Sequence, residues 1–179
     1  MVCILLGTGF EEAEALVPAD MLRRANIDVC MAGVDGIDIT GAHHITVKAD
    51  CAVADVNVDE LELLFLPGGL GGVDAIKSSP AAMELIRQAH EKGVKLAAIC
   101  AAPTILAELG YLNGKKAVCY TGFETQLDGA FVTDSSVETD GIFITARGAG
   151  VAVEFGLKLV ELVASKSESL RQKNAILCD

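Results

Sequence analysis

The chain has no tryptophan, and aromatic residues make up only 4% of its 179 residues. Its core must therefore be built from aliphatic side chains, since hydrophobic residues as a whole make up 51%. Basic residues are also few: 14 lysines and arginines against 25 acidic residues leave a net charge of -11. Binding to nucleic acid or to an acidic membrane surface requires a basic patch, so neither partner is expected.

Long apolar runs are absent as well. No stretch approaches the roughly 18 apolar residues of a membrane-spanning helix. The first residues, MVCILLGTGFEEAEA, have neither the basic segment nor the long apolar segment of a secretory signal. We therefore expect a cytoplasmic protein whose thiols stay reduced. A length of 179 residues predicts a single domain over residues 1–179.

The cysteines form no C-x-x-C pair and no cluster with histidine, although there are six of them. This spacing disfavours a disulfide framework and a zinc site, so no metal is expected. Cysteine often fills space in protein cores. That interpretation is given to five of the six: Cys3, Cys30, Cys51, Cys119 and Cys178. Cys100 differs because of its position in the chain.

Apolar runs alternate with helical patterns along the sequence. Buried strands are predicted at residues 2–7, 27–33, 61–69 and 95–100, and an edge or hairpin strand at 44–50. Shorter strands are predicted at 116–122, 130–134, 136–140 and 142–148. Helices are predicted at 11–26, 79–93, 102–110 and 150–165, with a further short helix within 168–179. The pattern predicts an α/β fold, with a mostly parallel sheet covered by helices on both faces.

Cys100 falls where a buried strand hands over to a helix. In parallel sheets, ligands bind beyond the carboxyl ends of the strands, where residues 7–14 and 67–69 also fall. Helix N-terminal N–H groups favour an anion, so we expect a lowered pKa and a reactive thiolate at Cys100. The same donors, with the N–H of Gly68 or Gly69, are expected to form an oxyanion hole.

A histidine partner for this thiol is not evident. His43 and His44 precede a short strand and His90 lies late in a surface helix, so all three are expected to be exposed. The residue after Cys100 is Ala101, which leaves no adjacent Cys-His pair. A thiol protease mechanism is therefore disfavoured.

Three glutamates crowd the start of the first helix. Glu11 and Glu12 are interpreted as complements to the helix dipole. Glu11 and Glu14 share a helical face, and either side chain could point inward. Glu14 is the stronger candidate: beside a thiolate its pKa would rise, and it could then hydrogen-bond the thiolate or shuttle a proton.

Five segments together resemble the ThiJ/PfpI superfamily in its Parkinson-associated DJ-one branch: GFEEAEALVPADMLRRA, LFLPGG, AAICAAPTILA, CYTGFE and ITARGAGVAVEFGLKLVE. The match runs in order over nearly the whole chain. The resemblance implies a flavodoxin-like α/β sandwich that forms a homodimer and needs no cofactor. It places the reactive cysteine of the nucleophile elbow on Cys100, its protonated partner on Glu14, and the backbone donors on Gly69 and Ala101.

Two positions depart from the family pattern. Tyr120 stands where several members have a histidine near the cysteine, which leaves Glu14 as the evident proton shuttle. His44 stands where an arginine is expected, and with Arg24 it would mark an anion-binding spot near the dimer interface.

The resemblance implies two alternative functions. In the first, Cys100 attacks a small dicarbonyl, as in members that convert methylglyoxal to lactate or act as protein deglycases. In the second, peroxide oxidises Cys100 to sulfinate, which Glu14 stabilises, and the protein is a redox sensor or chaperone in oxidative-stress defence. A non-catalytic scaffold and a peptidase are both disfavoured. Repeated turnover would distinguish the enzyme from the sensor.

Overall fold

A seven-stranded sheet forms the centre of the molecule, in the order β10-β11-β7-β6-β1-β2-β5. The computed structural model describes residues 1–178; Asp179, the last residue of the predicted terminal segment, lies outside them. Neighbouring strands run parallel except for β10 and β11. The bounds are β1 (Val2–Leu6), β2 (Val29–Gly33), β5 (Cys51–Ala52), β6 (Leu63–Leu66), β7 (Lys95–Ile99), β10 (Val137–Asp140) and β11 (Phe143–Ala146).

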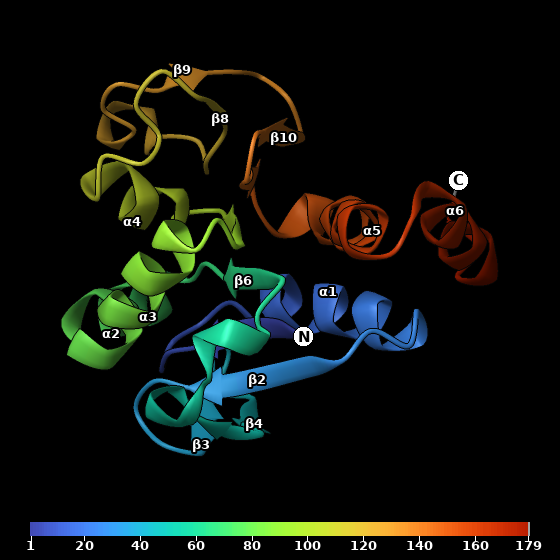
Figure 1. Ribbon diagram of the computed structural model, residues 1–179, viewed down its shortest axis with the longest axis horizontal. Coiled ribbons are helices and arrows are strands. Elements are labelled where there is room, and N and C mark those ends of the chain that lie inside the picture. Colours follow the sequence, from blue (N-terminus) through green and yellow to red (C-terminus); the bar gives the residue numbers. More distant parts are fainter. Residues whose placement is uncertain (179) are drawn as a thin grey trace.

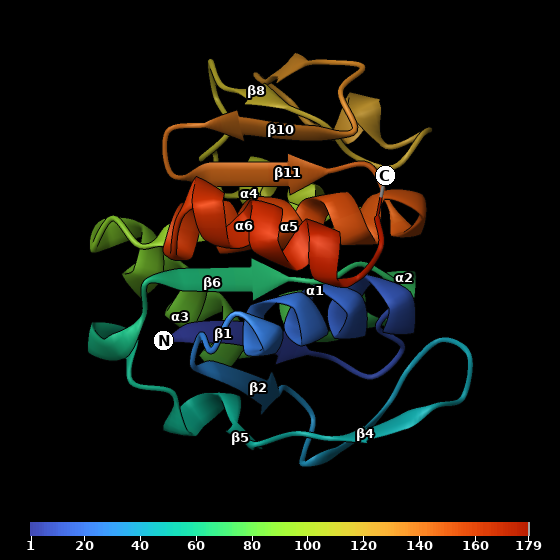
Figure 2. The same cartoon turned by 90° about the vertical axis from the view of Figure 1, so that its right-hand side faces the viewer.

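Helices cover both faces of this sheet (Figures 1 and 2). One face carries α1 (Glu12–Arg24) and α5 (Ala152–Val163), with α6 (Lys166–Ala175) packed on α5. The other face carries α2 (Leu70–Ser78), α3 (Pro80–Glu91) and α4 (Pro103–Glu108). The predicted α/β fold with a mostly parallel sheet between helices is confirmed.

The central strands β1 and β6 are apolar throughout, and β7 is apolar after Lys95, because both of their faces are covered. Along β1, Ile4 and Leu6 point to the cluster under α1 and α5, while Cys3 and Leu5 point to the cluster under α2, α3 and α4. Successive side chains of a strand alternate between faces, so a strand between two helix layers needs apolar residues at every position. This is why the continuous runs of the sequence correctly predicted β1, β6 and β7.

Two small sheets lie outside the central one. β3 (Asp38–Thr40) and β4 (Thr46–Lys48) form an antiparallel hairpin that projects beyond the carboxyl end of β2 (Figure 2). β8 (Lys116–Ala117) and β9 (Phe131–Val132) pair in parallel and are shorter than the strands predicted at 116–122 and 130–134. Short 3-10 turns complete the chain: η1 (Val53–Asp55), η2 (Val58–Glu60), η3 (Glu124–Gln126) and η4 (Ala149–Val151).

Helix α2 was not predicted from the sequence. Its first turn contains Gly71 and Gly72, and glycine is a poor helix former. The glycines allow the helix to pack on the loop after β1: a Cβ on Gly72 would lie 2.8 Å from Cα of Phe10. Close packing therefore explains a helix that intrinsic propensity disfavours.

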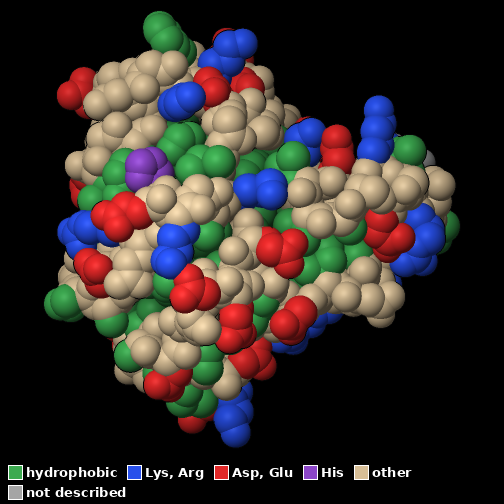
Figure 3. All heavy atoms as spheres, in the orientation of Figure 1, with side chains coloured by type: hydrophobic (Ala, Val, Ile, Leu, Met, Phe, Trp, Pro, Cys, Tyr) green, Lys and Arg blue, Asp and Glu red, His purple; other side chains and the backbone are tan. Residues whose placement is uncertain are grey.

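Acidic and basic side chains are interspersed on the face shown in Figure 3. On that face, at least, the negative net charge is not gathered into a single patch. Within residues 1–178, no helix combines the length and the apolar character that a membrane crossing requires.

Candidate functional site

Cys100 occupies the corner between β7 and α4 in a strained backbone conformation. Its φ is +65°, a left-handed backbone angle that residues other than glycine seldom adopt. The corner is fixed on both sides: the N–H of Cys100 donates to the oxygen of Ala146 (2.9 Å), and its own oxygen accepts from the N–H of Tyr120 (2.8 Å). The resulting turn leaves the thiol partly exposed in a cavity.

Glu14 reaches this thiol from the first turn of α1. Its side chain is only 1% exposed and hydrogen-bonds the Cys100 thiol. The N–H of Gly68 donates to Oε2 of Glu14 over 3.1 Å. The sequence offered Gly68 or Gly69 as an oxyanion donor, and the N–H of Gly68 is directed at the carboxyl group instead. The N–H groups of Gly69 and Ala101 do face the thiol.

Burial raises the pKa of Glu14 to about 7, and the charge of Glu11 raises it further, against the lowering effect of the hydrogen bond with Cys100. The sequence predicted this direction but attributed it to a thiolate; burial is the larger cause. Burial also raises the pKa of Cys100 to about 12, together with the adjacent Glu14 carboxylate, although the N–H groups of Ala101 and Gly69 lower it. The predicted lowering of the thiol pKa is therefore wrong, since two donors at a six-residue helix do not outweigh burial beside a carboxylate.

Cys100 and Glu14 consequently behave as one acid-base pair. The two effects of Glu14 that raise the thiol pKa belong to its ionised form. When the thiol proton passes to Glu14, the repulsion disappears, and the neutral carboxyl can donate a hydrogen bond to the thiolate. The arrangement thus favours a thiolate next to a protonated carboxyl over two adjacent anions.

Glu14 is expected to make the protein less stable as the pH rises through about 7. Its pKa rises from 4.5 to about 7 on folding, so between these values the native state binds a proton that the unfolded state has lost. The stabilisation is complete below pH 4.5 and is lost as the pH passes about 7. Relative to Glu14→Gln, which imitates the neutral carboxyl, the wild type should lose up to about 3 kcal/mol, since one pKa unit corresponds to about 1.4 kcal/mol.

Urea unfolding of both proteins at about pH 5 and about pH 8 measures this difference. The side-chain amide of the variant cannot titrate, so the variant controls for every other ionisable group. A stability difference that stays constant across this range would contradict a raised pKa at Glu14.

The thiol and the carboxyl open into a cavity of about 650 Å³. Gly69 and Ala101 line it beside Cys100, and the Tyr120 and Phe123 side chains form part of its wall. The two rings meet edge to face with centroids 6.5 Å apart, and Tyr120 is 52% exposed. Tyr120 therefore lines the cavity at its rim, at the position where several family members have a histidine. A small polar molecule can reach Cys100 from this side.

His43 also lines the cavity, which the sequence did not indicate. Its Nδ1 lies 3.0 Å from Oε2 of Glu12, and its N–H donates to Oε1 of Glu12 over 2.8 Å. Glu12 is 6% exposed and also accepts from the N–H of Ile45. The interpretation of Glu12 as a mere dipole complement is therefore wrong: this carboxylate fastens the loop between β3 and β4 to the start of α1.

The oxygens of Glu11 and Glu12 and the ring of His43 lie within 4.8 Å of one another, close enough to hold a metal ion. However, both oxygens of Glu12 already accept hydrogen bonds from the loop. The hydrogen bond from His43 to Glu12 raises the pKa of the histidine. These contacts account for the cluster as a loop anchor.

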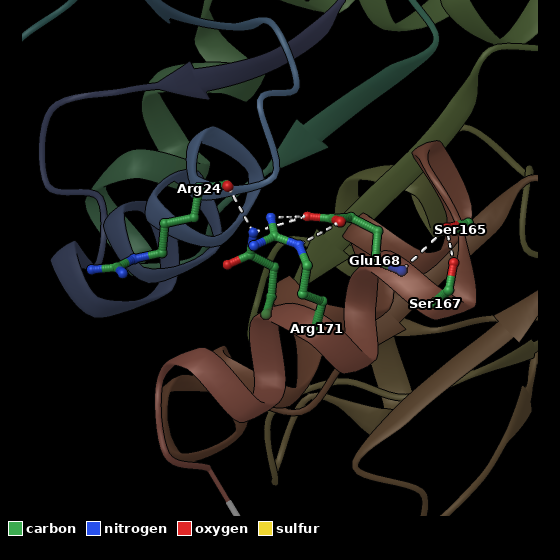
Figure 4. A network of polar contacts seen from close by, with 6 residues as sticks. Arg24, Ser165, Ser167, Glu168 and Arg171 are labelled. Carbon is green, nitrogen blue, oxygen red and sulfur yellow. Dashed lines mark hydrogen bonds and ion pairs between the residues drawn. The ribbon is translucent and has the colours of Figure 1, made fainter.

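Arg24 and His44 do not meet within this chain. Arg24 is the last residue of α1, whereas the loop that holds His44 is fastened to Glu12 at its first residue, about 18 Å away along the helix. Nε of Arg24 donates to Asp20 over 2.7 Å. Figure 4 shows the Arg24 side chain pointing away from Glu168 and Arg171 of α6, while its backbone oxygen accepts from the Gln172 side chain. The anion spot that these residues would mark near a dimer interface therefore stays a prediction.

Known proteins resemble this chain over most of its length. A family model described as the DJ-1/PfpI family matches residues 1–162. Protein dj-1beta of Drosophila melanogaster is 39% identical over 168 residues, which cover 92% of this chain and 90% of that protein. A protein named a deglycase, from Pyrococcus abyssi, is 31% identical over 164 residues, covering 90% and 98%.

Solved structures of DJ-1 proteins are similar to this chain over nearly its whole length. The crystal structure of Drosophila melanogaster DJ-1beta superposes with a TM-score of 0.95 at 36% identity, covering 99% of this chain and 97% of that chain. An oxidized form of Toxoplasma gondii DJ-1 superposes with a TM-score of 0.93 at 30% identity, with the same coverage of each chain.

Proposed function

Because the chain belongs to the DJ-1/PfpI family, we propose that it uses Cys100 to convert small reactive dicarbonyls into 2-hydroxy acids, as a cofactor-independent glyoxalase acting on methylglyoxal. One observation carries the proposal. The Cys100 thiol is in hydrogen-bond contact with a buried Glu14 whose pKa is about 7, and both residues line a cavity open to small molecules. A nucleophile paired with a proton carrier of neutral pKa suits an addition followed by a proton shift.

The reaction begins when the thiol proton passes to Glu14 and the Cys100 sulfur adds to the aldehyde carbon of methylglyoxal. The carbonyl oxygen takes a proton and a hemithioacetal forms, with the N–H groups of Gly69 and Ala101 placed to stabilise the developing oxyanion. Glu14, as carboxylate, then removes the proton from the former aldehyde carbon while the ketone oxygen takes a proton, which gives an enediol. The proton returns to the neighbouring carbon as the hydroxyl on the sulfur-bearing carbon loses its own proton, which yields a thioester. Water hydrolyses the thioester to lactate and restores the thiol.

We extend the proposal to protein deglycation, the activity in the name of the Pyrococcus abyssi relative. The first step would be the same, because an adduct of a dicarbonyl with a protein side chain presents carbon centres open to attack by a thiolate. The rim position of Tyr120 leaves room for a larger partner at the mouth of the cavity. From the family resemblance we also propose a cytoplasmic homodimer.

Redox sensing is the second candidate. Hydrogen peroxide would oxidise the Cys100 thiolate to sulfenate and then to sulfinate. Its partial exposure favours such a reaction, and a protonated Glu14 could donate a hydrogen bond to a sulfinate oxygen. A relative has been solved in an oxidized form. In this function the protein would respond to oxidative stress, as a sensor or as a chaperone, with one reaction per thiol.

Repeated turnover distinguishes a glyoxalase from a redox sensor. The purified protein is incubated with methylglyoxal in the absence of glutathione and added metal, and lactate is measured against the protein concentration. The glyoxalase proposal expects many molecules of lactate per chain. A Cys178→Ser variant is the matched control and should keep the wild-type rate, since Cys178 lines a different hollow, between η4, α5 and α6. One equivalent of adduct without lactate would leave the sensor as the supported function.

A further inference from the structure

Two cysteines far from Cys100 lie in contact at the edge of the sheet. Sγ of Cys30 in β2 lies 3.0 Å from Sγ of Cys51 in β5. Cys3 is the register partner of Cys30 on β1, and its thiol contacts Cys30 as well. All three side chains point to the same face of the sheet, because Cys51 pairs with Ala32, two residues beyond Cys30.

The burial of these cysteines differs. Cys3 is completely buried and fills the core, as the sequence predicted. Cys30 and Cys51 are only half-buried, so the space-filling interpretation does not describe them. β5 is the outermost strand on this side of the sheet. A small oxidant can therefore approach the Cys30–Cys51 pair from solvent without opening the core.

The surroundings of Cys30 favour its reaction with peroxide before that of Cys51. Hydrogen bonds from Cys3 and Cys51 lower the pKa of Cys30 to about 6, although burial and the nearby Asp50 and Asp28 oppose this. Burial raises the pKa of Cys51 to about 12, and its contact with Cys30 adds to the effect. These contacts favour the thiolate form of Cys30 and the neutral form of Cys51. With their sulfurs 3.0 Å apart, the two thiols have the arrangement of a peroxide-reactive cysteine with a resolving partner.

We propose that Cys30 and Cys51 form a second redox site, a dithiol that hydroperoxides convert to an intramolecular disulfide. The Cys30 thiolate attacks the peroxide oxygen, the O–O bond breaks, and Cys30 becomes a sulfenic acid while hydroxide leaves. The Cys51 sulfur then attacks the sulfur of the sulfenic acid and water leaves. In total, two thiols and one hydrogen peroxide give one disulfide and two water molecules, with both electrons accepted by the peroxide.

This site is separate from the Cys100 pair. Register places Cys30 level with Cys3, Leu64 and Leu96, and Cys100 lies four residues beyond Leu96. With about 4.8 Å between strands and about 3.3 Å per residue, Cys30 and Cys100 are about 19 Å apart. Thiol exchange between them within one chain is therefore excluded, and each must be oxidised by its own encounter with peroxide.

The disulfide would also act on the cavity. Cys30 and Cys51 bracket residues 31–50, which leave the sheet as the β3–β4 hairpin and return to β5. The loop of this hairpin carries Ala42 and His43 to the wall of the Cys100 cavity. A bond between Cys30 and Cys51 would join the two ends of the segment 31–50. The hydrogen bonds of Glu12 already hold the loop in the middle of this segment. Oxidation at the sheet edge would thus restrain one wall of the cavity.

Peptide mapping of the full-length wild type tests the proposal. After treatment with stoichiometric hydrogen peroxide, the remaining thiols are alkylated and the digest is searched for a peptide that links Cys30 to Cys51. We expect this linked peptide, a loss of these two thiols, an intact-mass decrease of about 2 Da from the disulfide itself, and reversal by dithiothreitol. In Cys100→Ser the same disulfide should form, because the two sites are independent.

Two further variants complete the design. In Cys51→Ser combined with Cys3→Ala, a sulfenic acid at Cys30 has no neighbouring thiol left, so it should be trapped by dimedone. Cys178→Ser is the matched control and should form the disulfide as the wild type does. Oxidation of Cys100 with Cys30 and Cys51 both still alkylatable would overturn the proposal, as would a disulfide that joins Cys30 to another chain. Peptide mapping of the wild type shows whether the Cys30–Cys51 disulfide forms even if a variant fails to fold.

Discussion

Replacing Cys100 by serine is expected to remove lactate formation, with kcat falling on the order of 10⁴-fold or more, as when other catalytic nucleophiles are removed. A serine hydroxyl is a far weaker acid than a thiol, and Glu14, with a pKa of about 7, is too weak a base to ionise it. The hydroxyl nearly matches the thiol in size, so the shape of the cavity is kept. Methylglyoxal consumption and lactate release are measured side by side.

Glu14→Gln separates the nucleophile from the proton carrier. The amide can hydrogen-bond the thiol but cannot accept its proton. The rate of lactate formation should therefore fall by about 10²–10⁴-fold, less than for Cys100→Ser.

The Cys100→Ser protein should retain its fold, because serine and cysteine meet the same strain at a φ of +65°. Lactate formation by a well-folded Cys100→Ser protein at more than about one hundredth of the wild-type rate would exclude covalent catalysis by this thiol.

Gly68→Ala is expected to damage both the site and the fold. A Cβ at this position would lie 2.6 Å from Cβ of Cys100 and 3.0 Å from the backbone oxygen of Ile99. It would also meet Oε2 of Glu14, which accepts the Gly68 N–H. The carboxyl can swing aside, but the backbone of Ile99 and the corner at Cys100 cannot move without disturbing β7. The nucleophile and its proton carrier would therefore be pushed apart.

The expected loss of stability is about 1–3 kcal/mol, typical of overpacking, which lowers Tm by several degrees in a protein of this size. Turnover should fall by about 10²-fold or more, because displacements near 1 Å can cost that much in a preorganised site. Gly150→Ala is the matched control: a Cβ there meets nothing within 4 Å, so Tm and turnover should stay close to those of the wild type. Equal behaviour of the two variants would contradict the tight contact around Gly68.

The sequence predicted the central elements well where burial imposes a simple pattern. Strands covered on both faces are apolar along their buried positions, so β6 and the part of β7 after Lys95 could be predicted from the sequence alone. Helix α2 was missed because its glycine-rich first turn is selected by contact with Phe10, which local propensity does not report. The short strands β8 and β9 were overestimated for the same kind of reason, since their ends depend on tertiary pairing.

The site divides in a similar way. Cys100 and Glu14 could be proposed from a strand-to-helix corner, a helix start and a family resemblance. The contact of Glu12 with His43 joins residues 31 positions apart through an irregular loop, and no local pattern signals it. The Cys30–Cys51 contact spans 21 positions and depends on the register of β2 with β5. Such contacts need the assembled sheet.

The backbone strain at Cys100 has a consequence for how this chain can change over generations. A left-handed conformation costs residues other than glycine about 1–2 kcal/mol, so the protein would gain stability by exchanging the thiol for glycine. Mutational drift and selection for heat resistance would both push position 100 in that direction. Only a benefit to the organism from the thiol itself can oppose this push. Cysteine at this corner would therefore be among the first residues lost from a lineage in which the reaction had ceased to matter.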